Sequence, residues 1–295
     1  MQPRDAWPEL PLAAWRGSKE ALHLFLQIVG KLRLACAPFV NHWWHVTFHL
    51  HAHGLTTRPF ACGGRTIEIR FDFLTHRLII ETDDDGIVAF NYIGLTVADF
   101  YDSVMRSLGA LQIEIPILAR PYDTFTDIPF AADRTHRLEH PDELEKFGQV
   151  LRTIWPIFET FRGRYKGKSS PVHVFWHSFD LALTRFSGRA APLASGPAVA
   201  REAYSHEAIS VGFWAGDAQF PDAAFYSYTY PDPPGLGDEP LSPPQAVWDT
   251  SRGSHLALLY YRDVRTQPDP AATLLAFLES AYVAGARRAG WPTPS

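Results

Sequence analysis

The stretch PVHVFWHSFDLALTRFSGR occupies residues 171–189, and a similar stretch, WHVTFHLHAHGLTT, occupies residues 44–57. Aligning His45 with His173 also aligns His49 with His177, and no gap is needed. Residues 171–189 predict one long strand with a polar tip. The repeated pattern predicts an internal duplication, with one copy in each half of the chain.

The size and composition of the chain point to a protein that acts on small molecules. Its 295 residues can bury a sizeable core in either two small domains or one large one. Aromatic residues make up 14% of the chain, enough to fill a core and also line a pocket for a flat ligand. The net charge of −5 argues against nucleic acid or an acidic membrane surface as a partner.

The cysteines and the start of the chain indicate a cytoplasmic protein. Cys36 and Cys62 lie in different segments and form no CxxC pair, so we expect neither a disulfide framework nor a cysteine zinc site. The first residues lack the order of a secretion signal, and no apolar run reaches membrane-spanning length.

The first half is predicted to hold a helix followed by strands. Residues 1–17 predict an arm without regular structure, and Ser18 is the expected N-cap of a helix that ends before Pro38. Alternation along residues 45–53 predicts a strand with its histidines on one face. We expect further strands at 67–73, 77–82, 87–92 and 111–118, and a helix that begins at Thr96.

The second half repeats this order after an irregular connection at 119–140. A helix is predicted from Pro141, with a kink or break at Pro156, and a closing helix from Asp269. Residues 231–244 suit either a lid or a disordered loop. Strands are expected at 171–189, 205–214, 224–230 and 255–264. The fold class is therefore α+β, with two similar halves at 18–118 and 141–295, each an antiparallel sheet backed by helices, packed as one globular unit.

Histidines give the sharpest chemical signal. His45 and His173 become equivalent if the halves are related by an approximate two-fold axis, and His206 could join them as a third ligand of Zn, Fe, Cu or Ni. Glu207 beside His206 would then handle protons, so His206 and Glu207 are the candidate catalytic residues. The structural alternative is that these imidazoles hydrogen-bond to each other, to water or to the backbone.

Basic residues flank the second histidine-bearing stretch. Lys168, Arg185 and Arg189 suit a carboxylate or phosphate group of a ligand, although ordinary solvated ion pairs are the alternative. Asp180 interrupts an apolar strand and by parity faces away from His173 and His177. We expect Arg185 or Arg189 to pair with Asp180, so a structural ion pair competes with a role in the site.

Aromatic residues supply a third candidate feature. Tyr226, Tyr228 and Tyr230 alternate onto one strand face and predict an aromatic wall with polar tips. Trp44, Trp176 and Tyr204 would line the same pocket between the halves. The alternative is that this face is simply the core between two sheets.

Several motifs are absent from the sequence. It has no GxGxxG or GxxxxGK[ST] loop, no GxSxG elbow and no HExxH pair. This argues against nucleotide-phosphate enzymes, ordinary serine hydrolases and zincin proteases.

Three motifs carry a resemblance to a known family. They are NHWWHV at 41–46, KSSPVHVFWHSFDLALTRFSGR at 168–189 and EAYSHE at 202–207. With them the chain resembles, over nearly its whole length, a bacterial family catalogued only as a domain of unknown function. The resemblance implies a cytoplasmic bacterial protein of about this length and implies no activity.

Two functional hypotheses follow. One is a metal-assisted enzyme on a small anionic substrate, which Lys168 and Arg185 would hold. The other is a non-catalytic protein that binds an acidic or aromatic metabolite between Trp176, Tyr226 and the arginines. The sequence does not decide between an enzyme and a binding protein.

Overall fold

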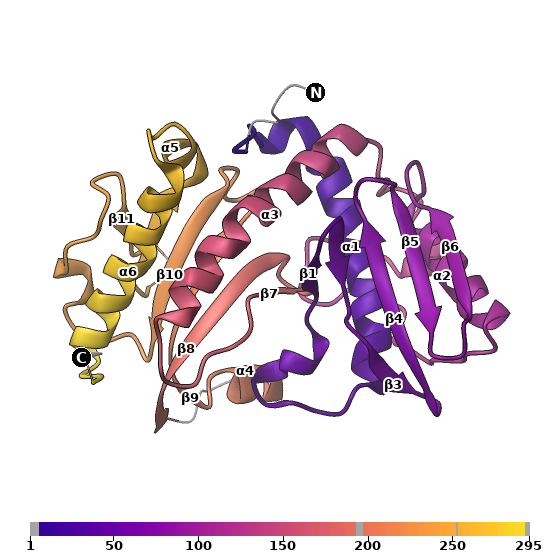
Figure 1. Cartoon of the computed structure of the whole chain (residues 1–295), viewed down its shortest axis with the longest axis horizontal. Helices are drawn as coiled ribbons and strands as arrows, with labels where there is room; N and C mark the ends of the chain where they lie inside the picture. The colour runs from indigo at the N-terminus through magenta and orange to yellow at the C-terminus, as the bar shows by residue number, and fades with distance from the viewer. Residues whose placement is uncertain (1–5, 193–196, 252, 293–295) are drawn as a thin grey trace.

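The computed structural model describes residues 6–192, 197–251 and 253–292, and it has an α+β fold with two antiparallel sheets (Figure 1). In the first sheet the strand order is β1 (His49–His51), β2 (Gly54–Thr56), β4 (Arg65–Asp72), β5 (Arg77–Thr82) and β6 (Ile87–Asn91), with β3 (Phe60–Cys62) also paired to β4. In the second sheet the order is β11 (Val247–Asp249), β12 (Leu256–Tyr260), β10 (Ala224–Tyr230), β9 (His206–Trp214), β8 (Asp180–Ala190) and β7 (His173–Phe175). Each sheet comes from one half of the chain and has helices packed near it, as predicted.

The first half contains α1 (Leu12–Cys36), η1 (Asn41–Val46), β1 (His49–His51), β2 (Gly54–Thr56), β3 (Phe60–Cys62), β4 (Arg65–Asp72), β5 (Arg77–Thr82), β6 (Ile87–Asn91) and α2 (Val97–Ala110), and the connection contains η2 (Phe130–Ala132). The second half contains α3 (Pro141–Gly163), β7 (His173–Phe175), β8 (Asp180–Ala190), α4 (Ala198–Ala203), β9 (His206–Trp214), β10 (Ala224–Tyr230), η3 (Leu236–Asp238), β11 (Val247–Asp249), β12 (Leu256–Tyr260), α5 (Tyr261–Arg265) and α6 (Pro270–Arg288). The predicted meander is confirmed as β4, β5 and β6.

Helix α1 lies along the junction of the two halves and contacts both (Figure 1). Within the first half, Phe25 stacks on Phe100 of α2 with 3.9 Å between ring centroids. Toward the second half, Gly30 lies under the indole of Trp176, and a Cβ atom at this glycine would come within 2.5 Å of the ring. The missing side chain therefore allows α1 to approach the second sheet closely.

The two sheets also meet directly through their backbones. The amide N of Phe48 lies 2.9 Å from the carbonyl O of Val174, and the amide N of Val174 lies 2.8 Å from the carbonyl O of Phe48. This antiparallel bridge connects the segment before β1 to β7. The two histidine-bearing stretches are thus neighbours in space.

Helix α1 begins earlier than predicted. It starts at Leu12, inside the predicted arm, because Leu12 and Trp15 find buried positions there. Ser18 is not its N-cap: the Ser18 hydroxyl accepts hydrogen bonds from the backbone amides of Glu139 and His140 just before α3. The predicted caps of α2 at Thr96 and of α6 at Asp269 are confirmed.

Two predicted strands are broken and one is absent. Residues 171–189 form a hairpin of β7 and β8, and the turn between them contains Phe179 with a φ of 62°. His45 lies in η1, so within the predicted strand at 45–53 only β1 forms. Residues 113–119 are described without regular structure, while α3 continues through Pro156 to Gly163.

The cysteines also differ from expectation. Cys36 and Cys62 form a disulfide bond, with 5.0 Å between their Cα atoms. The bond connects the end of α1 to β3. Sequence separation alone gave no sign of this contact, because the approach depends on how α1 packs against the first sheet.

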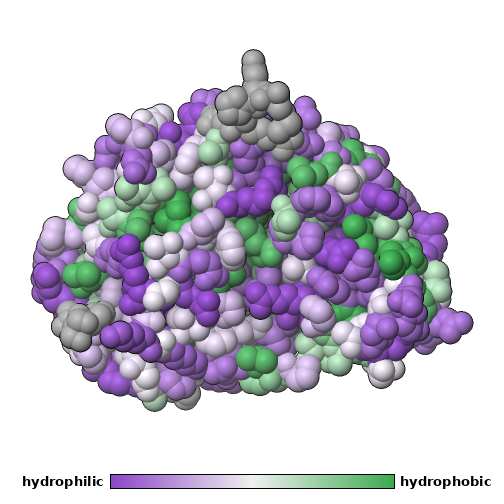
Figure 2. All heavy atoms as spheres, viewed as in Figure 1, coloured by the Kyte–Doolittle hydropathy of each residue, from purple (hydrophilic) through white to green (hydrophobic). Residues whose placement is uncertain are grey.

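The loop at 231–244 packs against α6 through Glu239, which forms ion pairs with Arg287 and Arg288. This loop contributes no residue to the cavity described below. The face in Figure 2 is mostly polar, with apolar side chains in separate small areas. Among the described helices, none is long and apolar enough to cross a membrane.

Candidate functional site

A cavity of about 490 Å³ lies between the two halves of the chain. One wall is the face of the second sheet that α3 and α6 leave uncovered. The other wall comes from the end of α1, from η1 and from α4. Its aromatic lining residues are Trp43, Trp44, Tyr122, Phe175, Trp176, Phe186, Tyr204, Tyr226 and Tyr228, and its charged or polar ones include Lys31, His42, His177, Ser178, Asp180, Thr184 and Ser210.

Alternation along β8 decides which side chains reach this cavity. Asp180, Ala182 and Thr184 line it. Leu183 and Arg185 have the opposite parity, so they point to the helical layer. The guanidinium group of Arg185 stacks on the Phe161 ring of α3, 3.4 Å from its centroid, and donates to the Phe161 carbonyl.

The turn between β7 and β8 changes the expected parity. Because the strand is interrupted before Asp180, the side chains of Trp176, His177 and Ser178 also line the cavity. Burial lowers the pKa of His177, and the negative charges of Asp180 and Asp123 oppose that change. Asp180 and His177 are therefore neighbours, whereas an unbroken strand predicts opposite faces.

Asp180 is held by hydroxyl groups and not by an arginine. Tyr226 on β10 and Ser178 in the turn each donate a hydrogen bond to its carboxylate. The predicted pairing with Arg185 or Arg189 is therefore wrong. Burial, and then the charge of Asp180, raises the pKa of Tyr226 well above its ordinary value, so this hydroxyl stays protonated.

The predicted tyrosine wall is present on β10. The rings of Tyr226 and Tyr228 stack with 6.2 Å between their centroids. Tyr204, at the end of α4, packs on Tyr230 with a centroid distance of 4.6 Å. Tyr204, Tyr226 and Tyr228 line the cavity, whereas Tyr230 lies beyond it.

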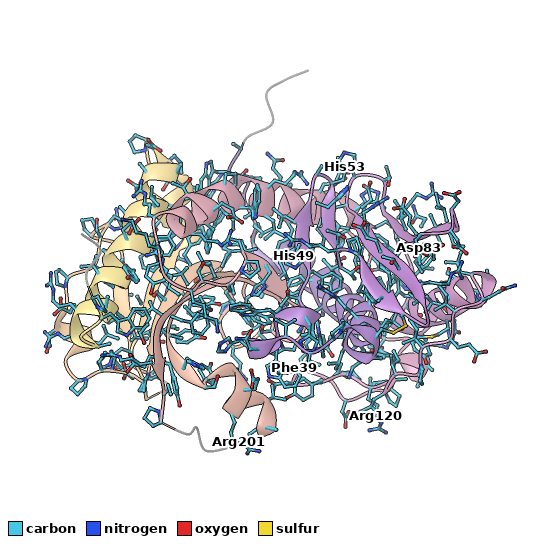
Figure 3. All side chains as sticks on the ribbon, turned by 60° about the horizontal axis from the view of Figure 1, so that its bottom comes forward. Phe39, His49, His53, Asp83, Arg120 and Arg201 are labelled. Carbon is cyan, nitrogen blue, oxygen red and sulfur yellow. A yellow bond between two sulfur atoms is a disulfide. The ribbon has the colours of Figure 1, made fainter. Side chains whose placement is uncertain are left out.

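The segment η1 closes the cavity and has an unusual backbone. His42 and Trp43 both have positive φ angles, 56° and 62°, which are costly for residues other than glycine. Contacts with α4 hold this conformation: the His42 amide donates to Glu202, and the Trp43 indole donates to the Val199 carbonyl. Figure 3 labels Phe39, which precedes η1, and Arg201 on α4.

Two lysines bring positive charge to the cavity. The Nζ atom of Lys31 lies 5.6 Å from the centroid of Trp176, and burial lowers its pKa. At the other side, the Nζ atom of Lys168 lies 2.9 Å from Nε2 of His42 and 5.3 Å from the centroid of Trp44. Within the described residues, neither ammonium group forms an ion pair with a carboxylate, although the negative charge of Glu202 raises the pKa of Lys168 against the larger lowering by burial.

The three motifs singled out in the sequence thus meet at one cavity. A model of a family described as "Family of unknown function (DUF5996)" matches residues 7–295. The chain belongs to this family. No curated protein and no solved structure was found to match it.

Five of the eight residues predicted to bind substrate line the cavity of this DUF5996 protein: Trp44, Trp176, Asp180, Tyr204 and Tyr226. Lys168 lies beside it through its contact with His42. Arg185 and Arg189 do not line it, because Arg185 packs among helices and Arg189 forms an ion pair with Glu207.

The predicted catalytic pair is divided between two faces of β9. Glu207 lies on the helical side, where it also accepts hydrogen bonds from Ser187 and Trp291. The imidazole of His206 faces the other way and lies 5.5 Å from the ring of His42. Glu207 of the DUF5996 protein therefore lies on the opposite side of β9 from the cavity.

The three predicted metal ligands have separate contacts. Nδ1 of His45 lies 3.2 Å from the Val40 carbonyl, Nδ1 of His173 lies 3.1 Å from the Thr47 hydroxyl, and Nδ1 of His206 lies 3.1 Å from the Ser205 hydroxyl. Over residues 6–192, 197–251 and 253–292, no group of three or more His, Cys, Asp or Glu side chains is arranged to hold a metal.

Four lining residues of the cavity were not expected from the sequence, namely Lys31, His42, His177 and Ser178. His42 lies in the motif NHWWHV, so the sequence offered a reason to include it among the candidate residues. Lys31 gave no signal, because its position beside the cavity depends on the close approach of α1 to Trp176. The sequence placed His177 and Ser178 on an unbroken strand, so their shared face with Asp180 was unforeseen.

Proposed function

We propose that this protein binds a small aromatic metabolite with an acidic group in the cavity between its two halves. The observation that carries the proposal is the charge of the lining. Lys31 in the cavity lining and Lys168 beside it bring two ammonium groups to an aromatic cavity. In the described part of the chain neither forms an ion pair, and only Lys168 is influenced by a carboxylate, that of Glu202. An anionic group on the ligand would supply the missing charge.

The walls favour a flat ligand. Trp44, Trp176, Tyr226 and Tyr228 present ring surfaces on both sides of the cavity, and stacking on such rings is favourable for aromatic groups. A volume of about 490 Å³ lies in the range of pockets that bind metabolites. The Asp180 and Tyr226 pair would orient polar substituents of the ligand.

Binding without turnover is better supported than the metal-assisted reaction. That reaction needs His45, His173 and His206 near one another and near Glu207, and each of these side chains has a different partner. The proposal includes no metal in the cavity. The cytoplasmic location and the internal duplication of the chain stay predictions.

A thermal-shift screen with matched compounds tests the proposal. Aromatic carboxylic acids should raise the melting temperature of the protein, and the corresponding neutral amides should not. Mass spectrometry after incubation should recover each stabilising acid unchanged. Equal shifts for acids and amides would contradict the role of the lysines, and chemical conversion of the acid would favour the enzyme hypothesis.

A further inference from the structure

A second cluster of polar groups lies outside the cavity, where the two sheets meet. The backbone bridge between Phe48 and Val174 connects the halves there. Thr47 and His49 flank this bridge on the first half, and His173 flanks it on the second half. Figure 3 shows His49 near the middle of the molecule, and its side chain is almost entirely buried.

Arg33 brings a buried positive charge to this cluster. Only 8% of the residue is exposed, and one guanidinium nitrogen donates to the carbonyl of Thr47. Its Nε atom has no hydrogen-bond partner, and no described carboxylate forms an ion pair with it. The charge of Arg58, which is also positive, acts on it and lowers its pKa together with burial. A buried guanidinium without a counter-charge is costly.

Arg185 is a second buried arginine of this chain, and its positive charge has partners. Its guanidinium lies over the ring of Phe161 at 3.4 Å and over the ring of Tyr282 at 4.3 Å, and the carboxylate of Glu279 also acts on it. The charge of Arg185 is thus compensated by rings and an acid. Arg33 has neither kind of partner within the described residues.

Two imidazoles with unused nitrogens complete the cluster. The rings of His49 and His173 are 6.1 Å apart, and Nδ1 of His49 and Nε2 of His173 have no hydrogen-bond partner. Burial lowers the pKa of His49 to about 2 and that of His173 to about 3, so both rings are neutral near pH 7. The positive charges of Arg33 and Arg58 contribute to both of these low pKa values, after burial.

We propose that Arg33, His49 and His173 bind a small inorganic anion of about the size of chloride or bromide. An anion would neutralise Arg33 and accept a hydrogen bond from its Nε atom. It would also accept one from Nε2 of His173 in the tautomer in which Nδ1 accepts from the Thr47 hydroxyl, and one from Nδ1 of His49 in the tautomer that carries its proton there. A cation is disfavoured because Arg33 and Arg58 are close. The ion must be small, since Arg33, Thr47, His49 and His173 are all buried.

Such an ion would stabilise the contact between the halves, because its ligands come from α1, β1 and β7. The site does not overlap the cavity proposed for the metabolite. Failure of one proposal therefore leaves the other intact.

The test is the melting temperature of the full chain in chloride, bromide or gluconate at one pH and one ionic strength. Chloride and bromide should raise the melting temperature by about 3 °C or more relative to gluconate, which is too large for the site. Arg33→Met should abolish this difference. Arg185→Met, the control, should lower the melting temperature and keep the difference.

Equal melting temperatures in all three salts would overturn the proposal, as would a halide response that survives in Arg33→Met. If Arg33→Met does not fold, chloride-35 NMR of the unaltered protein decides. Broadening of the chloride-35 signal by the protein would support the site if bromide reverses the broadening and gluconate does not. An absence of broadening would overturn the proposal.

Discussion

Tyr226 on β10 donates a hydrogen bond to Asp180 on β8, across the full width of the intervening strand β9. The contact is possible because Gly212 of β9 lies beneath the tyrosine ring. A Cβ atom at Gly212 would come within 2.3 Å of that ring. The carboxylate of Asp180 and the hydroxyl of Tyr226 therefore lie together on the cavity wall, with β9 between their strands.

Replacing Tyr226 with phenylalanine should destabilise the protein. Asp180 is only 7% exposed, and the loss of one of its two hydroxyl donors leaves a buried carboxylate less well bonded. We expect the free energy of unfolding to fall by about 1–3 kcal/mol, measured by urea denaturation. Tyr230→Phe is the matched control, and a loss of the same size there would show that the hydrogen bond is not responsible.

A methyl group at Gly212 should displace the Tyr226 ring. We expect Gly212→Ala to lower the free energy of unfolding by about 1–3 kcal/mol because the added atom has no space. In Gly17→Ala the new side chain meets nothing within 4 Å in the interior of α1, so stability should rise by about 0.5–1 kcal/mol. Similar effects of the two substitutions in urea denaturation would contradict this explanation.

Acid should destabilise the fold through its buried histidines. Burial lowers the pKa of His23 to about 3, against 6.5 in an unfolded chain, so below pH 6.5 the unfolded state binds the additional proton. The free energy of unfolding should be level above pH 7 and fall as the pH decreases toward 4. His23→Gln should reduce this slope by up to about 1.4 kcal/mol per pH unit. Denaturation curves from pH 7.5 to pH 4 with identical slopes in both proteins would refute the assignment.

Reduction of the disulfide should also lower stability. The bond between Cys36 and Cys62 closes a loop with a sequence separation of 26, for which chain entropy predicts a contribution of about 3 kcal/mol. Urea denaturation with and without dithiothreitol measures it. The double variant Cys36→Ser with Cys62→Ser should not respond to dithiothreitol; a response there would show that the reductant acts elsewhere.

Local patterns were sufficient for much of the fold. Alternation predicted the meander and the tyrosine face of β10, and cap residues predicted α2 and α6. These features depend on neighbours in sequence. Among the wall residues, Trp44 and Trp176 could be proposed because they lie in the two histidine-bearing stretches, and Tyr226 because alternation places it on the tyrosine face.

Features that depend on tertiary contacts were not predictable. The turn before Asp180 requires Phe179 in a left-handed conformation, and this reverses the parity on which the pairing of Asp180 was argued. Glu207 follows His206 directly, but alternation along β9 turns it to Arg189 and the helical face. Lys31 reaches the cavity only because Gly30 allows α1 to lie against Trp176.

The central claim is that the cavity between the halves binds an anionic aromatic molecule. Isothermal titration of the most stabilising aromatic acid into the unaltered protein, Lys31→Met and Arg189→Met tests it most directly. We predict at least about tenfold weaker binding in Lys31→Met, because one charge-assisted contact is lost, and unchanged binding in Arg189→Met. Unchanged affinity in Lys31→Met, or a loss only in Arg189→Met, would contradict the account.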